Sequence, residues 1–146
     1  MADFSKIPWI AAHIELYKTD PEAAHMWDSS DLGGPGILPT LLLTTRGRKS
    51  GEPRSLPLIY GTHGDSYTII ASKGGNKDHP LWYLNLEGEP RCELMVGARA
   101  ISAVARVAQG AEREEIWEKM VEIYPPYVDY QNATDRIIPV VVLDPV

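Results

Sequence analysis

Residues 38–72, LPTLLLTTRGRKSGEPRSLPLIYGTHGDSYTIIAS, decide the fold of this chain. Apolar and β-branched residues dominate the stretches 38–46, 54–61 and 67–72, which predicts three strands. The intervening segments GRKSGEP and THGDS are rich in Gly, Pro and small polar residues, so they predict tight turns and antiparallel hairpins. Pro57 indicates that the second strand lies at an edge or carries a bulge, because proline cannot donate a ladder hydrogen bond.

The remaining sequence adds further strands and the helices between them. Strands are predicted over 91–96, 99–108 and 136–145, and helices over 5–18, 21–27, 79–88 and 110–123. Ser5 is the candidate cap of the first helix, and residues 124–135 form an aromatic-rich segment interrupted by prolines. Helices do not alternate with strands, so a parallel nucleotide-binding sheet fits poorly. The order predicts an α+β fold in which six antiparallel strands form a closed sheet with flanking helices.

Length and composition bound the class of protein. A chain of 146 residues suits a single domain, and 44% hydrophobic and 23% charged residues are ordinary for a globular protein. Cys92 is the only cysteine, which excludes an intramolecular disulfide and a cysteine-based zinc site and favours a reducing compartment. His13, His25, His63 and His79 have no ligand-like spacing, so no metal is predicted. No apolar run is long enough to span a membrane and no signal peptide is visible, so we expect a cytoplasmic protein.

Charge is distributed unevenly along the chain. Residues 1–39 hold two basic and six acidic residues, residues 40–80 hold six and three, and residues 81–146 hold six and eleven. The three segments therefore carry −4, +3 and −5, which agrees with the net charge of −6. An acidic protein is a poor general partner for nucleic acid. The basic segment in its middle indicates a local anion site, and the alternative is a random fluctuation of surface charge.

The first candidate binding segment is the turn within residues 44–54. Gly47 and Gly51 let the backbone bend tightly, and the exposed amides of such a turn can surround an anion. Arg48, Lys49, Ser50 and Arg54 add cations and a hydroxyl donor suited to phosphate or carboxylate. The spacing matches neither a P-loop nor a G-x-G-x-x-G motif. The alternative is a solvated hairpin turn, in which such residues are also common.

Two further segments have a composition suited to a planar ligand. Residues 71–77 combine the end of a strand, Ser72, Lys73 and an adjacent pair of glycines, which suits a backbone that passes close to a ring system; a flexible loop is the alternative. In residues 80–86, Trp82 and Tyr83 could form a wall of a binding site. Large aromatic residues at helical spacing more often pack in a core.

The fourth segment contains three tyrosines at three-residue intervals, Tyr124, Tyr127 and Tyr130. This spacing places them on one face of a helix or tight turn. Their phenols can line a pocket for an aromatic acceptor and donate a proton. Core packing with the hydroxyls directed to solvent is the alternative.

Taken together, these segments resemble the deazaflavin (coenzyme F420)-dependent nitroreductase family, also described as F420-dependent quinone reductases. The resemblance is carried in family order by LLLTTRGRKSGEPR, PLIY, ASKGGNKDHPLWYLNL, EPRCELMVG, EIYPPYVDYQNATDR and IPVVVLDP, from about Gly36 to Pro145. It implies a split β-barrel like that of FMN-binding proteins, with an N-terminal helical segment at 1–35 and the barrel domain at 36–146. The implied cofactor is a 5-deazaflavin with a phosphate and a glutamate tail, whose negative charges suit the basic segment.

The resemblance also implies a role for individual positions along the cofactor. The phosphate and tail would be contacted by Arg48, Lys49, Ser50 and Arg54. The length of the cofactor would be followed by Ser55, Leu56, Pro57, Leu58 and Ile59, and its ring and linker would meet Ile70, Ala71, Ser72 and Lys73. The walls would be completed by Leu81, Trp82, Tyr83, Leu84, Asn85 and Tyr127. Tyr124 and Tyr130 would shape the acceptor pocket. Tyr127, Tyr130, Ser72 or water would supply a proton after hydride transfer, and the sequence does not choose between them.

The implied activity is hydride transfer from reduced F420 to an electron-poor organic acceptor: a quinone, an activated alkene such as an unsaturated lactone, or a nitroaromatic compound. The alternatives are an FMN-dependent reductase or oxidase on the same barrel, and an F420-binding carrier without turnover. We expect a small-molecule partner, no nucleic acid, and a monomer or weak homodimer. Peripheral membrane contact through the N-terminal helix is not favoured, because that helix carries acidic residues.

Overall fold

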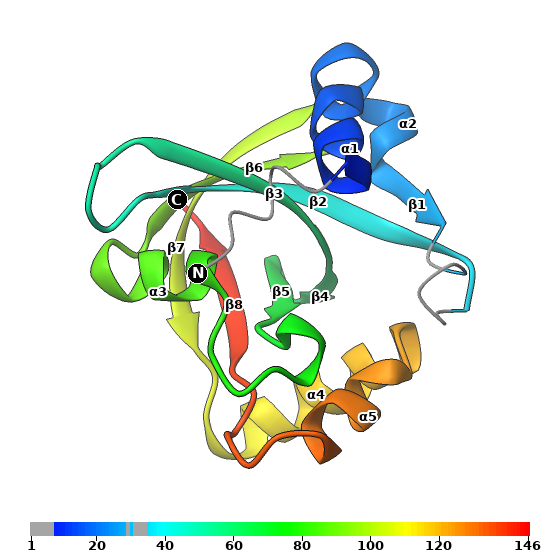
Figure 1. Ribbon diagram of the computed structural model, residues 1–146, viewed down its shortest axis with the longest axis vertical. Coiled ribbons are helices and arrows are strands. Elements are labelled where there is room, and N and C mark those ends of the chain that lie inside the picture. The colour runs from blue at the N-terminus through cyan, green and yellow to red at the C-terminus, as the bar shows by residue number, and fades with distance from the viewer. Residues whose placement is uncertain (1–7, 29, 31–34) are drawn as a thin grey trace.

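The computed structural model describes residues 8–28, 30 and 35–146, which fold around one strongly curled antiparallel sheet (Figure 1). The strands are β1 (Met26–Asp28), β2 (Ile37–Arg46), β3 (Pro53–Ile59), β4 (Gly61–His63), β5 (Ser66–Ile70), β6 (Arg91–Val96), β7 (Arg99–Val107) and β8 (Val140–Pro145). The helices are α1 (Pro8–Thr19), α2 (Pro21–His25), α3 (Leu81–Gly88), α4 (Gly110–Ile123) and α5 (Pro126–Asn132), with a short 3-10 helix η3 (Lys73–Gly75).

Strand β2 organises the sheet because it pairs with three others. The strand order is β1-β2-β6-β7-β8-β5-β4, and β3 pairs with β2 off this path. Leu41 of β2 lies opposite Leu58 of β3, and Leu42 lies opposite Pro57. In the part of the chain that the structure describes, β3 pairs with β2 alone, so the prediction that Pro57 marks an edge strand is confirmed.

The strand count differs from the prediction in two places. The predicted helix 21–27 ends at His25, and Met26 to Asp28 form β1, which pairs with β2. The predicted strand 54–61 divides at Tyr60, since Gly61 to His63 form β4 and pair with β5 instead. The first residue of β4 is glycine because α4 packs closely against it. A Cβ atom at Gly61 would lie 2.7 Å from Met120 Sδ of that helix. The described residues thus form eight strands, not six.

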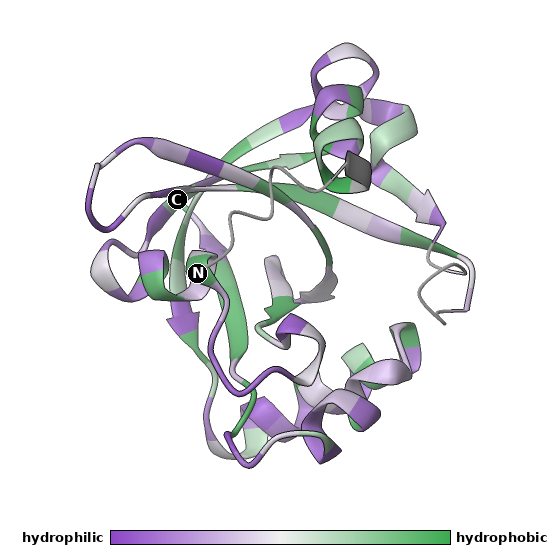
Figure 2. Ribbon diagram, viewed as in Figure 1, coloured by the Kyte–Doolittle hydropathy of each residue, from purple (hydrophilic) through white to green (hydrophobic). Residues whose placement is uncertain are grey.

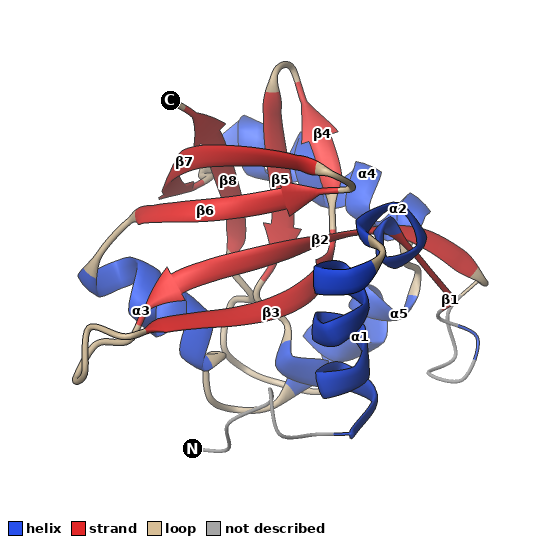
Figure 3. Cartoon of the chain, turned by 90° about the horizontal axis from the view of Figure 1, so that it is seen from above, coloured by secondary structure: helices blue, strands red, loops and turns tan. Residues whose placement is uncertain are grey.

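The predicted closure of the sheet is also only partly correct. No ladder joins β3 to β4 or β5 within the described residues, so the sheet is a curled half-barrel (Figure 3). The last strand is shorter than the predicted 136–145, since β8 begins at Val140. Pro139 precedes it and has no amide hydrogen to donate to a ladder.

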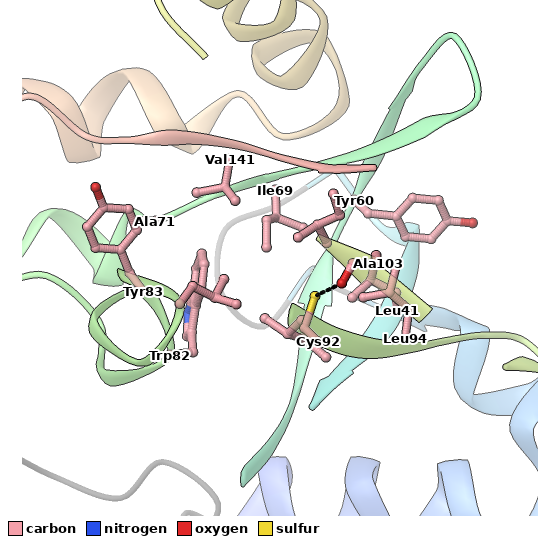
Figure 4. Packing of buried hydrophobic residues seen from close by; sticks show 13 residues of the cluster. Leu41, Tyr60, Ile69, Ala71, Trp82, Tyr83, Cys92, Leu94, Ala103 and Val141 are labelled. Carbon is pink, nitrogen blue, oxygen red and sulfur yellow. Dashed lines mark hydrogen bonds between the residues drawn. The ribbon is translucent and has the colours of Figure 1, made fainter. Parts of the chain in front are cut away.

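Buried residues form two hydrophobic clusters on opposite faces of β8. Val141 and Leu143 belong to the first cluster, which contains Trp82 and Tyr83 of α3 (Figure 4). Val140 and Val142 belong to the second, which is completed by residues of α4 and α5. Successive side chains of a strand point to opposite faces, so a continuous apolar run is what a strand covered on both faces requires. In Figure 2 the strand β8 is coloured as hydrophobic, whereas the turn that joins the end of β2 to the start of β3 is largely hydrophilic.

Three of the four predicted helices agree well with the structure, and α5 forms within residues 124–135, which were not predicted as a helix. Helix α4 has the predicted bounds, α3 lies within the predicted 79–88, and α1 covers most of the predicted 5–18. The candidate cap Ser5 lies outside the described residues. In the described residues, no helix is long and apolar enough to cross a membrane, and no group of His, Cys, Asp or Glu is arranged to hold a metal ion.

Candidate functional site: a tyrosine-lined cavity and a cationic turn

A cavity of about 160 Å³ lies where α1, β3 and α5 approach one another. An apolar cavity of about 150 Å³ can hold a benzene ring, so this one is suited to a single ring. Its lining residues come from the N-terminal helices and strands and from the segment around α5: His13, Trp27, Thr40, Pro57, Leu58, Ile59, Ile70, Ser72, Tyr124, Tyr127 and Tyr130. Six of the implied cofactor positions therefore line the cavity together with Tyr124 and Tyr130: Pro57, Leu58, Ile59, Ile70, Ser72 and Tyr127.

Tyr127 and Tyr130 lie one turn apart on α5, and Tyr124 caps the C-terminal end of α4 just before that helix, so the three side chains meet. The hydroxyl groups of Tyr124 and Tyr130 are 2.9 Å apart and share a hydrogen bond. The ring of Tyr127 lies 4.9 Å from that of Tyr124 and 6.2 Å from that of Tyr130 between centroids. Burial raises the pKa of Tyr124 and of Tyr127 above that of a free phenol. Both phenols therefore stay protonated near neutral pH and can donate hydrogen bonds.

The loop that follows β5 carries Ser72 and lies against α5. Gly75 has a φ of +80°, and a Cβ atom there would lie 2.6 Å from the Tyr130 carbonyl oxygen. The close approach that the paired glycines were predicted to allow is thus to the backbone of α5. Lys73 has a φ of 46°, in the left-handed region.

Arg136 holds this loop in place, and sequence reasoning missed it. Its guanidinium donates hydrogen bonds to the carbonyl oxygens of Ala71 (3.1 Å), Ser72 (2.7 Å) and Asn76 (2.8 Å). It also lies 3.2 Å from Nδ1 of His79. Burial, with a contribution from the charge of Arg136, lowers the pKa of His79. The available signal was a lone basic residue just before an apolar strand.

The cationic turn between β2 and β3 is a separate feature. The amide of Gly47 donates to the Glu52 carbonyl oxygen at 2.9 Å and that of Gly51 donates to Gly47 at 2.9 Å, which closes a tight turn. Arg48, Lys49 and Ser50 are exposed, and Arg54 lies 4.0 Å from Glu52. None of these cations lines the cavity.

Strand β3 connects the turn to the cavity. Figures 1 and 3 both show the turn at the end of the molecule far from α5. Arg54 lies at the start of β3 and Leu58 lies on the cavity wall, about 13 Å further along at ~3.3 Å per residue. Ser55 and Leu56 lie between them. A ligand that reaches both places must be elongated, with an anionic end at the turn.

Helix α3 contributes mainly structure. Trp82 and Tyr83 are buried in the first hydrophobic cluster, Ala71 packs there too, and Leu84 packs against it. Asn85 is buried, accepts a hydrogen bond from the Arg48 amide (3.2 Å) and donates one to Thr45 Oγ1 (3.1 Å). The structure does not bring Leu81, Trp82, Tyr83, Leu84 or Asn85 to the cavity. Asn85 instead fixes the cationic turn on the body of the protein.

A curled antiparallel sheet with a ring-sized cavity and a distant cationic turn is suited to an elongated small molecule with an anionic end. The comparisons agree: the sequence pattern of the F420H2-dependent quinone reductase family matches residues 23–145. An F420H2-dependent quinone reductase of Mycobacterium tuberculosis is 41% identical over 112 residues, which are 75% of each chain. The solved structure of an F420H2-dependent reductase superposes with a TM-score of 0.67 at 42% identity and covers 72% of this chain and 93% of that one.

The chain therefore belongs to the F420H2-dependent quinone reductase family. This confirms the predicted family, the predicted cofactor and the class of enzyme, a reductase that uses F420H2. A further solved chain, described as a domain-swapped dimer, has a TM-score of 0.71 at 35% identity and covers 94% of this chain and 98% of that one.

Proposed function

We propose that this chain reduces ring-sized, electron-poor organic acceptors with F420H2, with quinones as the principal class and unsaturated lactones and nitroaromatic compounds as further candidates. The observation that carries the proposal is the cavity of about 160 Å³ with three tyrosines on its wall. A planar ring suits such apolar and aromatic walls, and few polar groups suffice to orient it. The curled sheet also supports the split-barrel fold that the resemblance implies.

The residues of the cationic turn and of β3 fit an anionic, elongated cofactor. Arg48 and Lys49 form no ion pair within the described residues, and Arg54 has one long contact at 4.0 Å, so their charges are available to a ligand. Arg48, Lys49, Ser50 and Arg54 would hold the phosphate and tail, and β3 would run along the cofactor towards the cavity. Ile70 and Ser72 would meet the ring. When bound, reduced F420 supplies the hydride.

The protein's own part in the reaction is orientation and proton supply. The tyrosines and Leu58 exclude water from one side of a bound ring and fix its position. Tyr127 and Tyr130 both line the cavity with their phenol rings, and Ser72 adds a further hydroxyl. We assign proton donation to one of these groups. The hydrogen bond between Tyr124 and Tyr130 makes Tyr130 the group whose proton can be replaced from a neighbour.

The test mixes the full chain with reduced F420 and, in turn, a quinone, an unsaturated lactone and a nitroimidazole, while the absorbance of the cofactor is followed. We expect turnover with the quinone. The double variant Lys49→Ala, Arg54→Ala should bind F420 roughly tenfold or more weakly at low salt, since exposed charge attraction is screened as salt rises. Lys119→Ala, which removes an exposed cation of α4, is the matched control and should bind normally.

Three results would contradict the proposal. Binding of F420 without turnover of any acceptor would indicate a carrier. Equal F420 affinity in the double variant and in Lys119→Ala would remove the assignment of the turn to the anionic tail. Preferential binding of FMN, visible as a yellow protein, would replace the cofactor assignment for this chain.

A further inference from the structure

His13 of α1 lies on the cavity wall, outside the residues 23–145 that match the family. Its Nε2 atom is 2.7 Å from the carbonyl oxygen of Ala24. A carbonyl oxygen only accepts hydrogen bonds, so Nε2 must carry the hydrogen. In the neutral imidazole ring, Nδ1 is then left as an acceptor with a lone pair.

This Nδ1 atom has no hydrogen-bond partner in the described chain, and it is buried. The side chain of His13 is 7% exposed. Buried acceptors without a partner are rare in proteins because they lose their hydrogen bonds to water, so each one needs an explanation. Burial lowers the pKa of His13, which favours the neutral ring and therefore keeps Nδ1 as an acceptor.

The neighbouring groups do not satisfy this atom. Tyr17 stacks on the imidazole ring at 5.9 Å between centroids, but its hydroxyl donates to the carbonyl oxygen of Thr40. The hydroxyl of Thr40 donates to the Leu38 carbonyl oxygen at 3.3 Å. The lining residues of β3 are apolar: Pro57, Leu58 and Ile59. Within the described residues no group donates to Nδ1, so a molecule in the cavity would supply the donor.

We propose that Nδ1 of His13 accepts a hydrogen bond from a hydroxyl group on the ring of the organic acceptor, which makes His13 a specificity-determining residue for hydroxylated rings. The proposal rests on the cavity being the acceptor chamber of the proposed function. Because Nδ1 is covered by neighbouring atoms, the proposal includes a small tilt of the imidazole ring. The tilt keeps the hydrogen bond from Nε2 to the Ala24 carbonyl oxygen and brings Nδ1 to the cavity. A ring that carries a methoxy group in place of the hydroxyl cannot donate and gains nothing from this contact.

Two substitutions separate the two nitrogen atoms of the ring. His13→Gln places an amide nitrogen near the position of Nε2, so it can keep the bond to Ala24 while it removes the acceptor at Nδ1. His13→Asn places an amide oxygen near the position of Nδ1 and should restore that acceptor. Both are compared with the wild type by the amide NMR spectrum, which reports whether the fold is retained.

The test measures the binding of phenol and of its methyl ether, anisole, to the full chain without cofactor by NMR titration. We expect the wild type to prefer phenol, His13→Asn to keep part of that preference, and His13→Gln to lower the ratio of affinities roughly fivefold, the effect of one hydrogen bond. The ¹⁵N resonance of Nδ1 should shift with phenol and not with anisole. An unchanged ratio in a folded His13→Gln variant, or no shift of Nδ1, overturns the proposal.

A second arm separates this inference from the proposed function. With reduced F420, the KM of the wild type should be lower for a benzoquinone that carries a hydroxymethyl group than for its methoxymethyl counterpart, and His13→Gln should remove the difference. If phenol binding depends on His13 but no quinone is reduced, the function fails and the histidine contact stands. If both quinones are reduced and His13→Gln changes neither the KM ratio nor phenol binding, the function stands and the inference fails.

Discussion

The cationic turn and the tyrosine-lined cavity differ in exposure and in how rigidly their side chains are held. Arg48, Lys49 and Ser50 are exposed and reach into solvent, whereas Tyr124 and Tyr127 are buried and belong to the second hydrophobic cluster. Charge attraction acts over several ångströms and tolerates movable side chains. Placement of a reacting ring requires walls that do not move. One end of the molecule can therefore change without loss of the fold, and the other cannot.

The largest expected difference is between Tyr127→Ala and Lys49→Ala. The side chain of Tyr127 is 5% exposed and packs in the second hydrophobic cluster. Truncation of a buried aromatic residue costs about 3–5 kcal/mol. Lys49 is exposed and lies in a turn, so its truncation should change the free energy of unfolding by less than about 0.5 kcal/mol.

Chemical denaturation of both variants measures this difference, provided that the free energy of unfolding falls with denaturant concentration at the same slope in both. Tyr67→Ala is a useful reference, since Tyr67 packs against the first cluster and does not line the cavity. Similar unfolding free energies for Tyr127→Ala and Lys49→Ala would show that the tyrosine wall is not part of the core. The contrast between the two regions would then be lost.

A smaller effect is expected at Asn85, which joins the two regions. Asn85→Leu removes hydrogen bonds to the Arg48 amide and to Thr45 Oγ1, and Thr45 is itself buried. Unsatisfied buried groups cost about 1–3 kcal/mol, so we expect destabilisation of that order. F420 affinity should fall as well, because the turn loses its attachment to α3.

Ser50→Ala is the matched control in the same turn. Its hydroxyl accepts an exposed hydrogen bond from the Glu52 amide at 3.1 Å, so its loss should cost less than about 0.5 kcal/mol. Equal stability of Asn85→Leu and Ser50→Ala, measured by thermal unfolding, would contradict the view that one buried amide anchors an otherwise exposed turn.

The features that sequence predicted are those with local signals. The period of α4, the turns at residues 47–53 and 64–65, and the shared face of Tyr124, Tyr127 and Tyr130 all depend on residues close in the chain. The strands β1 and β4 have three residues each, too few to show a pattern. Composition also left two meanings for Trp82, as a wall or as core, and its burial depends on β8, almost sixty residues away.

Long-range hydrogen bonds were out of reach for the same reason. Arg136 contacts carbonyl oxygens of residues 60 to 65 positions earlier, and carbonyl groups carry no sequence signal. The acceptor at Nδ1 of His13 depends on which ring nitrogen faces Ala24, which only the packing of α1 on α2 decides. The sequence thus predicts which segments carry candidate binding residues, and it does not predict the long-range hydrogen bonds that fix those segments in place.

The smallest expected effect is a dependence of stability on pH that arises at the cavity. Burial lowers the pKa of His13 in the folded protein, whereas the unfolded chain binds a proton with a pKa of about 6.5. Above that value neither state is protonated, and the free energy of unfolding does not depend on this group. As the pH falls below it, the unfolded state gains a proton that the folded state resists, so the folded state loses stability until the folded pKa is passed.

Unfolding of the wild type and of His13→Gln between pH 7.5 and about 5.5 tests this sign. The phenols of Tyr17, Tyr124 and Tyr127 stay protonated there, since burial raises the pKa of each, and they add no slope of their own. His79→Gln is the control for a second histidine of lowered pKa, which lies beside Arg136 and not on the cavity wall. His13→Gln should flatten the fall in stability on acidification, and an equally steep fall would show that His13 is protonated as easily in the folded chain as in the unfolded one. The wall of the cavity would then carry a protonated His13 instead of a hydrogen-bond acceptor at Nδ1. Both regions of the molecule would be cationic, and the contrast between them would disappear.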